Sequence, residues 1–427
     1  MDRLLFPVVW FFSSITLAFS LVLHNGYSLG IFVLFLLSLV FYFPLKRLNP
    51  PFEFIKLDTM LFAVLLVYGL AMMFFVYLDG WHTRELDRPS RFIFALPVLA
   101  LLMRCRPNNL SWLFYGVVSG AIGAFCLGLY ERLILGYGRA HGAEHPIMFG
   151  DTSMMLGLMS CAAAFYFYSR KSYIWLAVSI VGVLCGVGGS VLSASRGGWV
   201  ALPLIGLFLL WQSRDLLGKK NVVVVALAAF VIVSSAVAIP QTGIQGRVMQ
   251  AVDDVVRYTQ GDLKESSLGL RFDMWKGAFY LFQDAPLLGV GEYGGMVMKK
   301  EMAEQGLINP QSATHYHAHN EYLNALSLTG IIGFLALMAV YLVPLRLFLR
   351  KMREYKNNWN VKAYAMAGAL VPMSYMDFAL SQSMFSHNIG VMMYVFPIVF
   401  FWAAVRWAEK EYAEGLAPET LKANKSD

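Results

Sequence analysis

Long apolar runs, separated by short polar gaps, occupy most of the chain. A helix needs about 17 to 25 apolar residues to cross a bilayer, and twelve runs approach or reach that length. They cover residues 4–23, 27–45, 58–78, 91–103, 111–135, 147–168, 173–194, 198–212, 221–239, 322–345, 362–380 and 388–407. Because the runs are continuously apolar instead of alternating every second residue, they predict an all-α polytopic membrane protein of about twelve transmembrane helices and not a barrel.

One long polar insertion interrupts this pattern, at residues 240–320. Two groups of apolar residues recur in it at helical spacing, which predicts two amphipathic helices lying over the membrane part. The groups are Val248, Val252, Val255 and Val256, then Phe272, Trp275, Phe279 and Phe282. The predicted division is therefore spans 1 to 9 over residues 1–239, a helical cap over 240–320, spans 10 to 12 over 321–407, and a charged tail over 408–427.

The composition agrees with a membrane protein of many spans. Hydrophobic residues make up 58% and charged residues 14% of the 427 positions, a balance far from that of a soluble globular domain. The four cysteines lie in or beside apolar runs without C-x-x-C spacing, so neither a disulfide framework nor a thiolate metal site is indicated. The first run follows Met1 as a signal sequence would, but it is longer than a signal core, and we expect it to stay as the first span.

The distribution of basic residues predicts the orientation. With the N-terminus inside, 21 of the 34 Lys and Arg residues fall in inner segments, as the positive-inside rule requires. The net charge of +7 is then a topology signal and not a nucleic-acid footprint. All eight histidines fall in outer segments under this orientation, so the outer face, where the cap lies, is the expected functional face. No phosphate-binding G-x-x-x-x-G-K-[ST] loop occurs in the sequence.

Three histidines at alternate positions, His315, His317 and His319, lie directly before the tenth run. In an extended segment they would face one side and could converge on a metal such as zinc. Alternatively, only one histidine does chemistry. Asn320 is a good N-cap for a helix beginning at Glu321, which would place His319 at the positive helix end and favour its neutral, basic form.

Two arginine segments on the same predicted face suit a phosphate-bearing substrate. Arg196 lies in the small-residue turn Ser195-Arg196-Gly197-Gly198-Trp199, and Arg271 lies near the start of the second amphipathic helix. A guanidinium offers a planar fork to phosphate oxygens, and a helix start already favours an anion. Two arginines and one histidine together predict transfer of a group from a lipid-linked diphosphate. Arg139 and His145, before the sixth run, are supporting candidates for lining the substrate path.

Three segments carry a resemblance to a known family. They are Ser195-Arg196-Gly197-Gly198-Trp199; Arg271-x-x-x-Trp275-x-x-Ala278 with Pro286-Leu287-Leu288-Gly289-Val290-Gly291; and His319-Asn320-x9-Gly330-x-x-Gly333. Together they resemble the O-antigen ligase family and its relatives, the O-antigen polymerases and bacterial protein O-oligosaccharyltransferases. The motifs span roughly residues 190–335, and the first half of the chain matches only in its many apolar runs.

The resemblance implies a GT-C-type architecture with a periplasmic cap, and an inverting glycosyltransferase that uses no metal and no other cofactor. The donor would be O-antigen on undecaprenyl diphosphate and the acceptor lipid A-core, at the periplasmic face of a Gram-negative inner membrane. By analogy His319 is the catalytic residue, supported by Asn320, His317 and His315, while Arg196 and Arg271 bind the diphosphate. Membrane lipids are expected as surroundings, and no nucleic acid as a partner.

Three other activities stay open on the sequence. An O-antigen polymerase would differ only in its acceptor, and protein O-oligosaccharyltransferases usually have a longer C-terminal region than the one after residue 407. A lipid-linked glycan flippase or exporter would need charged residues along a central path through the spans, and the apolar runs contain few of these.

Overall fold

The structure is a computed structural model that describes residues 2–41, 54–195, 197–238, 249, 256 and 267–415. Over these ranges every regular element is helical. The helices are α1 (Asp2–Phe19), α2 (Gly26–Val40), α4 (Lys56–Leu78), α5 (Asp87–Leu102), α6 (Trp112–Leu129), α7 (Pro146–Ser169), α8 (Tyr173–Leu192), α9 (Leu202–Ala238), α11 (Ser267–Asp284), α12 (Glu292–Glu304), α13 (Pro310–Ala313), α14 (Glu321–Glu354), α15 (Trp359–Phe378) and α16 (Asn388–Ala413). Short segments η1 (Thr83–Leu86), η2 (Tyr130–Ile134), η3 (Gly197–Trp199) and η5 (Met384–Ser386) complete the described chain. An all-α fold is therefore confirmed for the described ranges.

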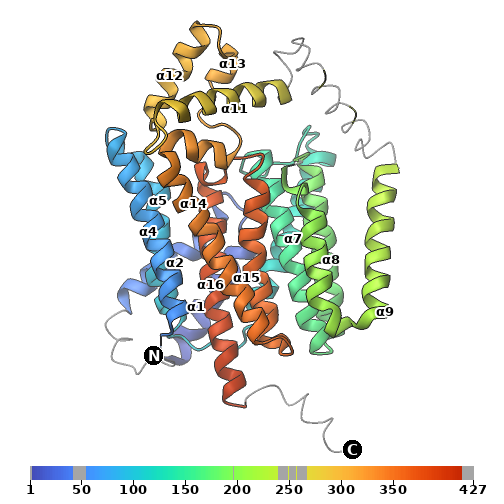
Figure 1. Ribbon diagram of the computed structural model, residues 1–427. Helices are drawn as coiled ribbons and strands as arrows, with labels where there is room; N and C mark the ends of the chain where they lie inside the picture. The colour runs from blue at the N-terminus through green and yellow to red at the C-terminus, as the bar shows by residue number, and fades with distance from the viewer. Residues whose placement is uncertain are drawn as a thin grey trace, which may run out of the picture.

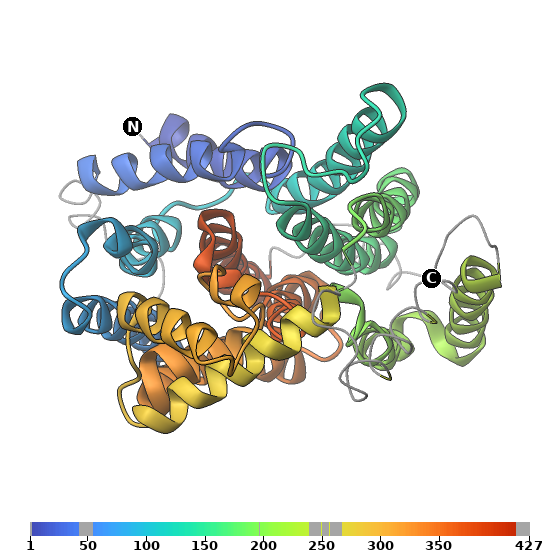
Figure 2. The same ribbon diagram turned by 90° about the horizontal axis from the view of Figure 1, so that it is seen from above.

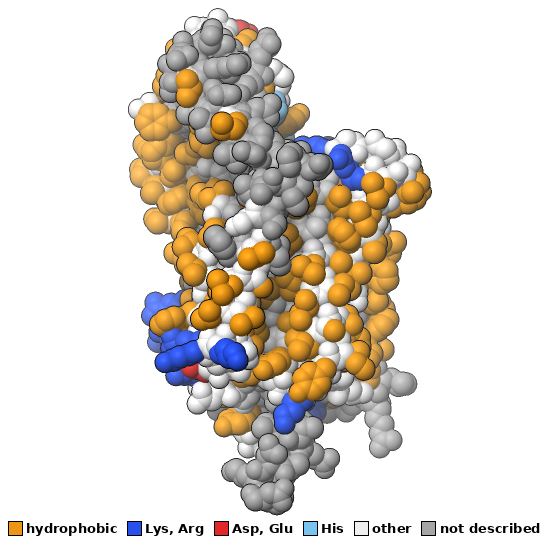
Figure 3. All heavy atoms as spheres, turned by 90° about the vertical axis from the view of Figure 1, so that its right-hand side faces the viewer, with side chains coloured by type: hydrophobic (Ala, Val, Ile, Leu, Met, Phe, Trp, Pro, Cys, Tyr) orange, Lys and Arg blue, Asp and Glu red, His pale blue; other side chains and the backbone are white. Residues whose placement is uncertain are grey.

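Most helices stand side by side as a bundle, with the yellow and orange helices α11 to α13 above one end (Figure 1). Within the described residues, seven segments are long and apolar enough to cross a membrane. They are Lys56–Leu78, Trp112–Ile134, Pro146–Ser169, Tyr173–Leu192, Gly197–Ala228, Glu321–Glu354 and Asn388–Ala413. Hydrophobic side chains cover the middle of the face in Figure 3, with Lys and Arg gathered below them. The polytopic membrane class predicted from the sequence is confirmed.

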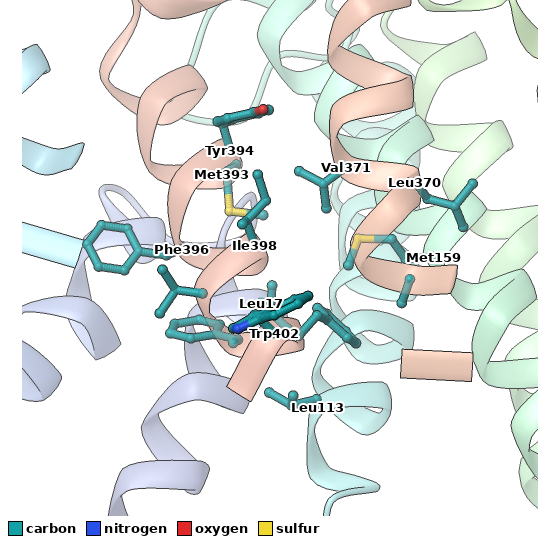
Figure 4. Close-up of a cluster of buried hydrophobic side chains, with 14 of the residues drawn as sticks. Leu17, Leu113, Met159, Leu370, Val371, Met393, Tyr394, Phe396, Ile398 and Trp402 are labelled. Carbon is teal, nitrogen blue, oxygen red and sulfur yellow. The ribbon is translucent and has the colours of Figure 1, made fainter. Parts of the chain in front are cut away.

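Two helices, α7 and α16, form the centre of the bundle. In each, 94% of the most apolar window is buried inside the protein. Side chains from α1, α6, α7, α15 and α16 meet around Trp402, as Figure 4 shows, and the Trp402 side chain is fully buried. Helices pack this closely in a membrane because their backbone hydrogen bonds are satisfied within each helix. The bundle is a rigid base for the loops at its ends.

Small residues let neighbouring helices approach closely. A Cβ at Gly186 of α8 would collide with the backbone of Gly157 in α7, and the Ser153 hydroxyl donates a hydrogen bond to the Gly186 carbonyl at 3.0 Å. Gly116 of α6 likewise faces the Ser14 backbone of α1. Such glycine contacts are the usual means by which membrane helices associate.

Helices α11, α12 and α13, called the cap below, lie across one end of the bundle. Figure 2, seen from above, shows α11 crossing over α14 and reaching toward the middle of the bundle. Leu281, Met302 and Ile308 form a small hydrophobic core of the cap. The sequence predicted an amphipathic helix around residues 272–282, where α11 lies. The other predicted helix, around the valines 248–256, falls almost entirely outside the described residues.

The cap is joined to α14 through backbone hydrogen bonds at a break in that helix. Gly330, inside α14, has φ 62° and ψ −166°, so the helix is interrupted there. The exposed backbone groups pair with the segment Pro286–Gly291: Ile331 N donates to Pro286 O at 2.9 Å, and Gly291 N donates to Leu328 O at 3.0 Å. A Cβ on Gly330 would collide with the Leu287 backbone. Gly330 therefore creates a docking point for the segment that leads into the cap.

A second attachment holds the start of α12 on the ends of α4 and α5. The Asp79 carboxylate accepts hydrogen bonds from Tyr293 N at 2.9 Å and Gly294 N at 3.4 Å. A carboxylate at this helix start is favourable because the free N–H groups carry partial positive charge. Arg88 of α5 also lies 3.5 Å from the Glu292 carboxylate. Two independent contacts thus fix the cap over the membrane part.

Candidate functional site

The predicted catalytic histidine lies on an irregular strap, residues 314–320, that connects the cap to α14. Asn320 is the N-cap of α14, as the sequence predicts, because its side-chain oxygen accepts from Leu323 N at 3.0 Å. His319 has φ 48°, a left-handed conformation unusual for a residue with a side chain. A strained backbone persists only where its surroundings hold it. The strap is held by residues of the cap and by the loop between α15 and α16.

Cap residues fix the strap from above. Trp275 of α11 donates its indole N–H to Ala318 O at 3.1 Å. The buried Lys299 of α12 donates through Nζ to His315 O at 2.7 Å and to Tyr316 O at 3.3 Å. The tryptophan of the Arg271-x-x-x-Trp275 motif therefore has a structural purpose: it ties the strap to the helix that carries Arg271.

The loop between α15 and α16, residues 379–387, fixes the strap from below. Glu321 N donates to Ala379 O at 2.8 Å, and Asn320 Nδ2 donates to Leu380 O at 3.2 Å. His319 Nδ1 lies 2.8 Å from Gln382 Oε1. The buried Glu321 carboxylate accepts from Phe385 N at 2.9 Å. A single loop therefore contacts three consecutive residues at the start of α14.

Four imidazole rings gather where the strap meets this loop. The ring centre of His319 lies 4.4 Å from that of His317 and 5.9 Å from that of His315. His387, from the 379–387 loop, lies 5.5 Å from His317. Among the described residues, no group of three or more His, Cys, Asp or Glu side chains is arranged to hold a metal ion. The alternate spacing therefore produces an imidazole cluster without the geometry of a metal centre.

Burial lowers the pKa of three imidazoles of this cluster, those of His317, His319 and His387, and so favours their neutral form. Burial, followed by the charge of Arg271, lowers the pKa of His319 to about 4. Burial and neighbouring histidines lower the pKa of His317 to about 3. Burial, then the charges of His145 and Arg88, lowers the pKa of His387 to about 4. The sequence predicted the neutral form of His319 from its position at a helix start. In the structure, the lowered pKa of His319 is caused mainly by burial and by the charge of Arg271.

The structure brings Arg271 close to the histidines. It lies in the second turn of α11 and its charge acts on both His319 and the buried Asp151. Its predicted partner, Arg196, lies outside the described residues. The residues on either side are described: Ser195 donates its hydroxyl to Asp151 Oδ1 at 3.0 Å, and Gly197 packs directly against the Ser381 hydroxyl. The Ser195–Trp199 segment is therefore adjacent to the 379–387 loop.

The supporting candidates Arg139 and His145 lie on the same side of the molecule. Arg139 Nε donates to Ser193 O at 2.8 Å, which ties its loop to the end of α8. His145 is the N-cap of α7, where its ring accepts from Ile147 N at 3.3 Å. Its ring is close enough to His319 and His387 that a proton on His145 would lower their pKa values. The loop before α7 thus contributes to the same region as the strap.

Several residues of the site were not predicted from the sequence. Gln382 contacts His319 directly, and the buried carboxylates Asp151 and Asp377 flank the segment that contains Arg196. Asp377 Oδ1 accepts from Ala201 N at 2.8 Å. The one available signal was the polar run Ser381-Gln382-Ser383 in a short gap between apolar runs. Such a run in a membrane protein is worth testing as a partner of a nearby catalytic motif.

Comparison with known proteins bears on the family. Residues 181–338 match the family described as O-Antigen ligase. An O-antigen ligase of Escherichia coli (strain K12) is 24% identical over 317 residues, covering 73% of this chain and 68% of that protein. The resemblance to the O-antigen ligase family is confirmed. An uncharacterized protein of Haemophilus influenzae is also similar, with 26% identity over 374 residues, 88% of this chain and 92% of that protein.

The O-antigen ligase match coincides with the parts that build the site. It contains the segment around Arg196, helix α11 with Arg271, the strap with His319, and the break at Gly330. It ends before the 379–387 loop. The partner of His319 in that loop therefore lies outside residues 181–338, the segment that matches the family model.

Proposed function

We propose that this protein is an O-antigen ligase. It transfers O-antigen polysaccharide from undecaprenyl diphosphate to lipid A-core, with inversion and without a metal. The observation that carries the proposal is the position of His319, a neutral imidazole on a fixed strap next to the charge of Arg271. A neutral base beside a cation suits a reaction in which a hydroxyl loses a proton while a diphosphate leaves.

His319 takes the proton of the acceptor hydroxyl as its oxygen attacks the anomeric carbon of the donor sugar. The bond from that carbon to the diphosphate oxygen breaks, and the electron pair leaves with undecaprenyl diphosphate. Arg271 and Arg196 stabilise the negative charge that develops on this leaving group. The protonated His319 then releases its proton to solvent. Attack opposite the leaving group inverts the anomeric centre.

The proposed setting is the periplasmic face of a Gram-negative inner membrane. The cap faces the periplasm, the chain crosses the membrane about twelve times, and the architecture is of the GT-C type. Asn320, His317, His315, Arg139 and His145 shape the site around His319. The support for this arrangement is that the described candidate residues gather at the end of the bundle covered by the cap, whereas the larger clusters of Lys and Arg side chains on the face in Figure 3 lie toward the other end, with a smaller group at the cap side.

The test uses purified protein, lipid-diphosphate-linked glycan and lipid A-core in the presence of a chelator. We expect glycosylated lipid A from the wild type and none from His319→Ala. The matched control is His24→Ala, which removes an exposed histidine between α1 and α2. Near-normal transfer by His319→Ala would contradict the general-base assignment, and loss of wild-type activity on chelation would restore the three-histidine metal site.

The nature of the product separates the alternative activities. Product formed only on further donor glycan would identify a polymerase, and product on a protein would identify an O-oligosaccharyltransferase. Donor movement across the membrane without a covalent product would identify a flippase or exporter.

A further inference from the structure

We propose that Gln382 is a positioning residue that holds His319 in one tautomer, with the proton on Nδ1 and the basic lone pair on Nε2. The inference rests on the proposed function in that it assigns a base role to His319. It goes beyond the match to the family model, because Gln382 lies outside residues 181–338 and comes from a different loop.

The hydrogen bonds around Gln382 fix its amide orientation. Gln382 Oε1 accepts the backbone N–H of Ser383 at 3.1 Å. A backbone nitrogen can only donate, so the atom facing it must be the carbonyl oxygen and not the NH₂ group. The same oxygen lies 2.8 Å from His319 Nδ1. Because an amide oxygen cannot donate, His319 must carry its proton on Nδ1. The ring then offers Nε2 as its only proton acceptor.

The other end of the amide acts on His387. Gln382 Nε2 lies 3.4 Å from His387 Nε2. An amide nitrogen donates, so the His387 nitrogen that faces it must hold a lone pair. One amide therefore contacts two imidazoles and is compatible with the neutral form of each. Protonating His387 at Nε2 would remove the acceptor that faces the amide, whereas protonating His319 at Nε2 leaves its Nδ1–H bond to Gln382 in place.

The charged groups around His319 explain why an amide suits this position better than a carboxylate. Arg271 acts on His319 from α11, His145 acts from the start of α7, and His315 acts from the strap itself. His317 and His387 complete the ring cluster. The buried Glu321 lies two residues after His319 in the chain. A carboxylate at position 382 would favour imidazolium and would weaken the positive potential offered to a diphosphate. The neutral amide orients the base without either effect.

Two variants separate orientation from charge. Gln382→Met keeps the length of the side chain and removes the acceptor. We expect kcat to fall at least about tenfold at all pH values. The upper bound is the roughly 10⁴-fold loss seen when the aspartate that orients the histidine of a Ser-His-Asp triad is changed. Gln382→Glu keeps an acceptor and adds a charge. We expect it to retain activity at alkaline pH but to lose it, as pH falls, about one pH unit or more earlier than the wild type.

The control is Gln305→Glu, the same charge change at an exposed position at the end of α12. It should leave the pH profile unchanged. A purely structural role for Gln382 would lower activity in both variants without moving the profile of Gln382→Glu. Wild-type kcat in Gln382→Met, or an unshifted profile in Gln382→Glu, would overturn the proposal.

A second measurement does not depend on turnover. Nitrogen NMR of ¹⁵N-histidine-labelled protein, with the His319 signals assigned by comparison with His319→Asn, reports which ring nitrogen carries the proton. We expect the proton on Nδ1 in the wild type and a mixture of tautomers in Gln382→Met. A proton on Nε2 in the wild type would refute the role of Gln382. Full activity of His319→Ala would instead refute the proposed function, so the two failures are distinguishable.

Discussion

Lowering the pH from 7.5 to 5.5 should leave the rate of glycan transfer almost unchanged. An ordinary imidazole, with a pKa of about 6.5, is roughly nine-tenths protonated at pH 5.5 and would retain about a tenth of its activity as a base. Burial and Arg271 lower the pKa of His319 to about 4. At pH 5.5 a group with that pKa is only about 3% protonated. The acid limb of the profile should therefore lie near pH 4.

The assay is the initial rate of transfer between pH 4 and pH 8 at saturating donor and acceptor. An aliquot from each pH is returned to pH 7.5, because acid also destabilises the fold. His317, His319 and His387 have pKa values below the ordinary value, so the unfolded chain binds more protons, and stability falls as pH drops from about 6.5 toward 4. Half-loss of the rate near pH 6.5, with full recovery on return to pH 7.5, would refute the reasoning.

Three further predictions concern Arg271 and the attachment of the cap. Arg271→Lys should lower kcat/KM for the lipid-diphosphate donor at least about tenfold, because a lysine cannot donate two parallel N–H groups, whereas the reverse exchange Lys276→Arg at an exposed position on α11 should be neutral. Asp79→Ala removes the carboxylate that caps α12 and should lower the local stability of that helix start by about 1–2 kcal/mol. Amide hydrogen exchange over residues 292–298 should become faster, and unchanged exchange would contradict this. Gly330→Ala should lower the unfolding temperature by several degrees, because φ is positive and the Leu287 backbone blocks a Cβ, while Gly206→Ala, with open space around it, should not.

The apolar pattern predicts most helices closely and is less accurate where a charge or a tertiary contact decides the outcome. The run predicted at 147–168 corresponds to α7 at Pro146–Ser169. The run ending at 407 continues to Ala413 in α16, where the buried carboxylate of Glu409 is paired with Arg406 and Lys351. Paired charges are tolerated inside a bundle, and the sequence does not show the pairing.

A local turn signal can also be overridden by a distant contact. Gly294 and Gly295 indicate a turn by composition, yet both lie in the first turns of α12. The Asp79 carboxylate, far away in the sequence, supplies the hydrogen bonds that start this helix. A local pattern cannot report a cap that another helix provides.

The candidate site shows the same limit. His319 and Asn320 are recognisable because a helix start and its cap are adjacent in the sequence. Gln382 and Asp151 are not, since each meets its partner across tens of residues, from a separate segment of the chain. The sequence offered His315, His317 and His319 as zinc ligands, or His319 alone as a base. Only the fold shows that a fourth histidine, His387, joins this group.

The junction between Pro286–Gly291 and the break in α14 has a consequence for how such proteins diversify. Its bonds join backbone atoms to backbone atoms, so they do not depend on the identity of the side chains except where glycine is needed. Side chains on the cap surface can therefore be exchanged without loss of this junction, and the strap keeps its place. Chimeras that swap cap sequences between relatives should be joined within Pro286–Gly291, with Gly289 and Gly330 retained.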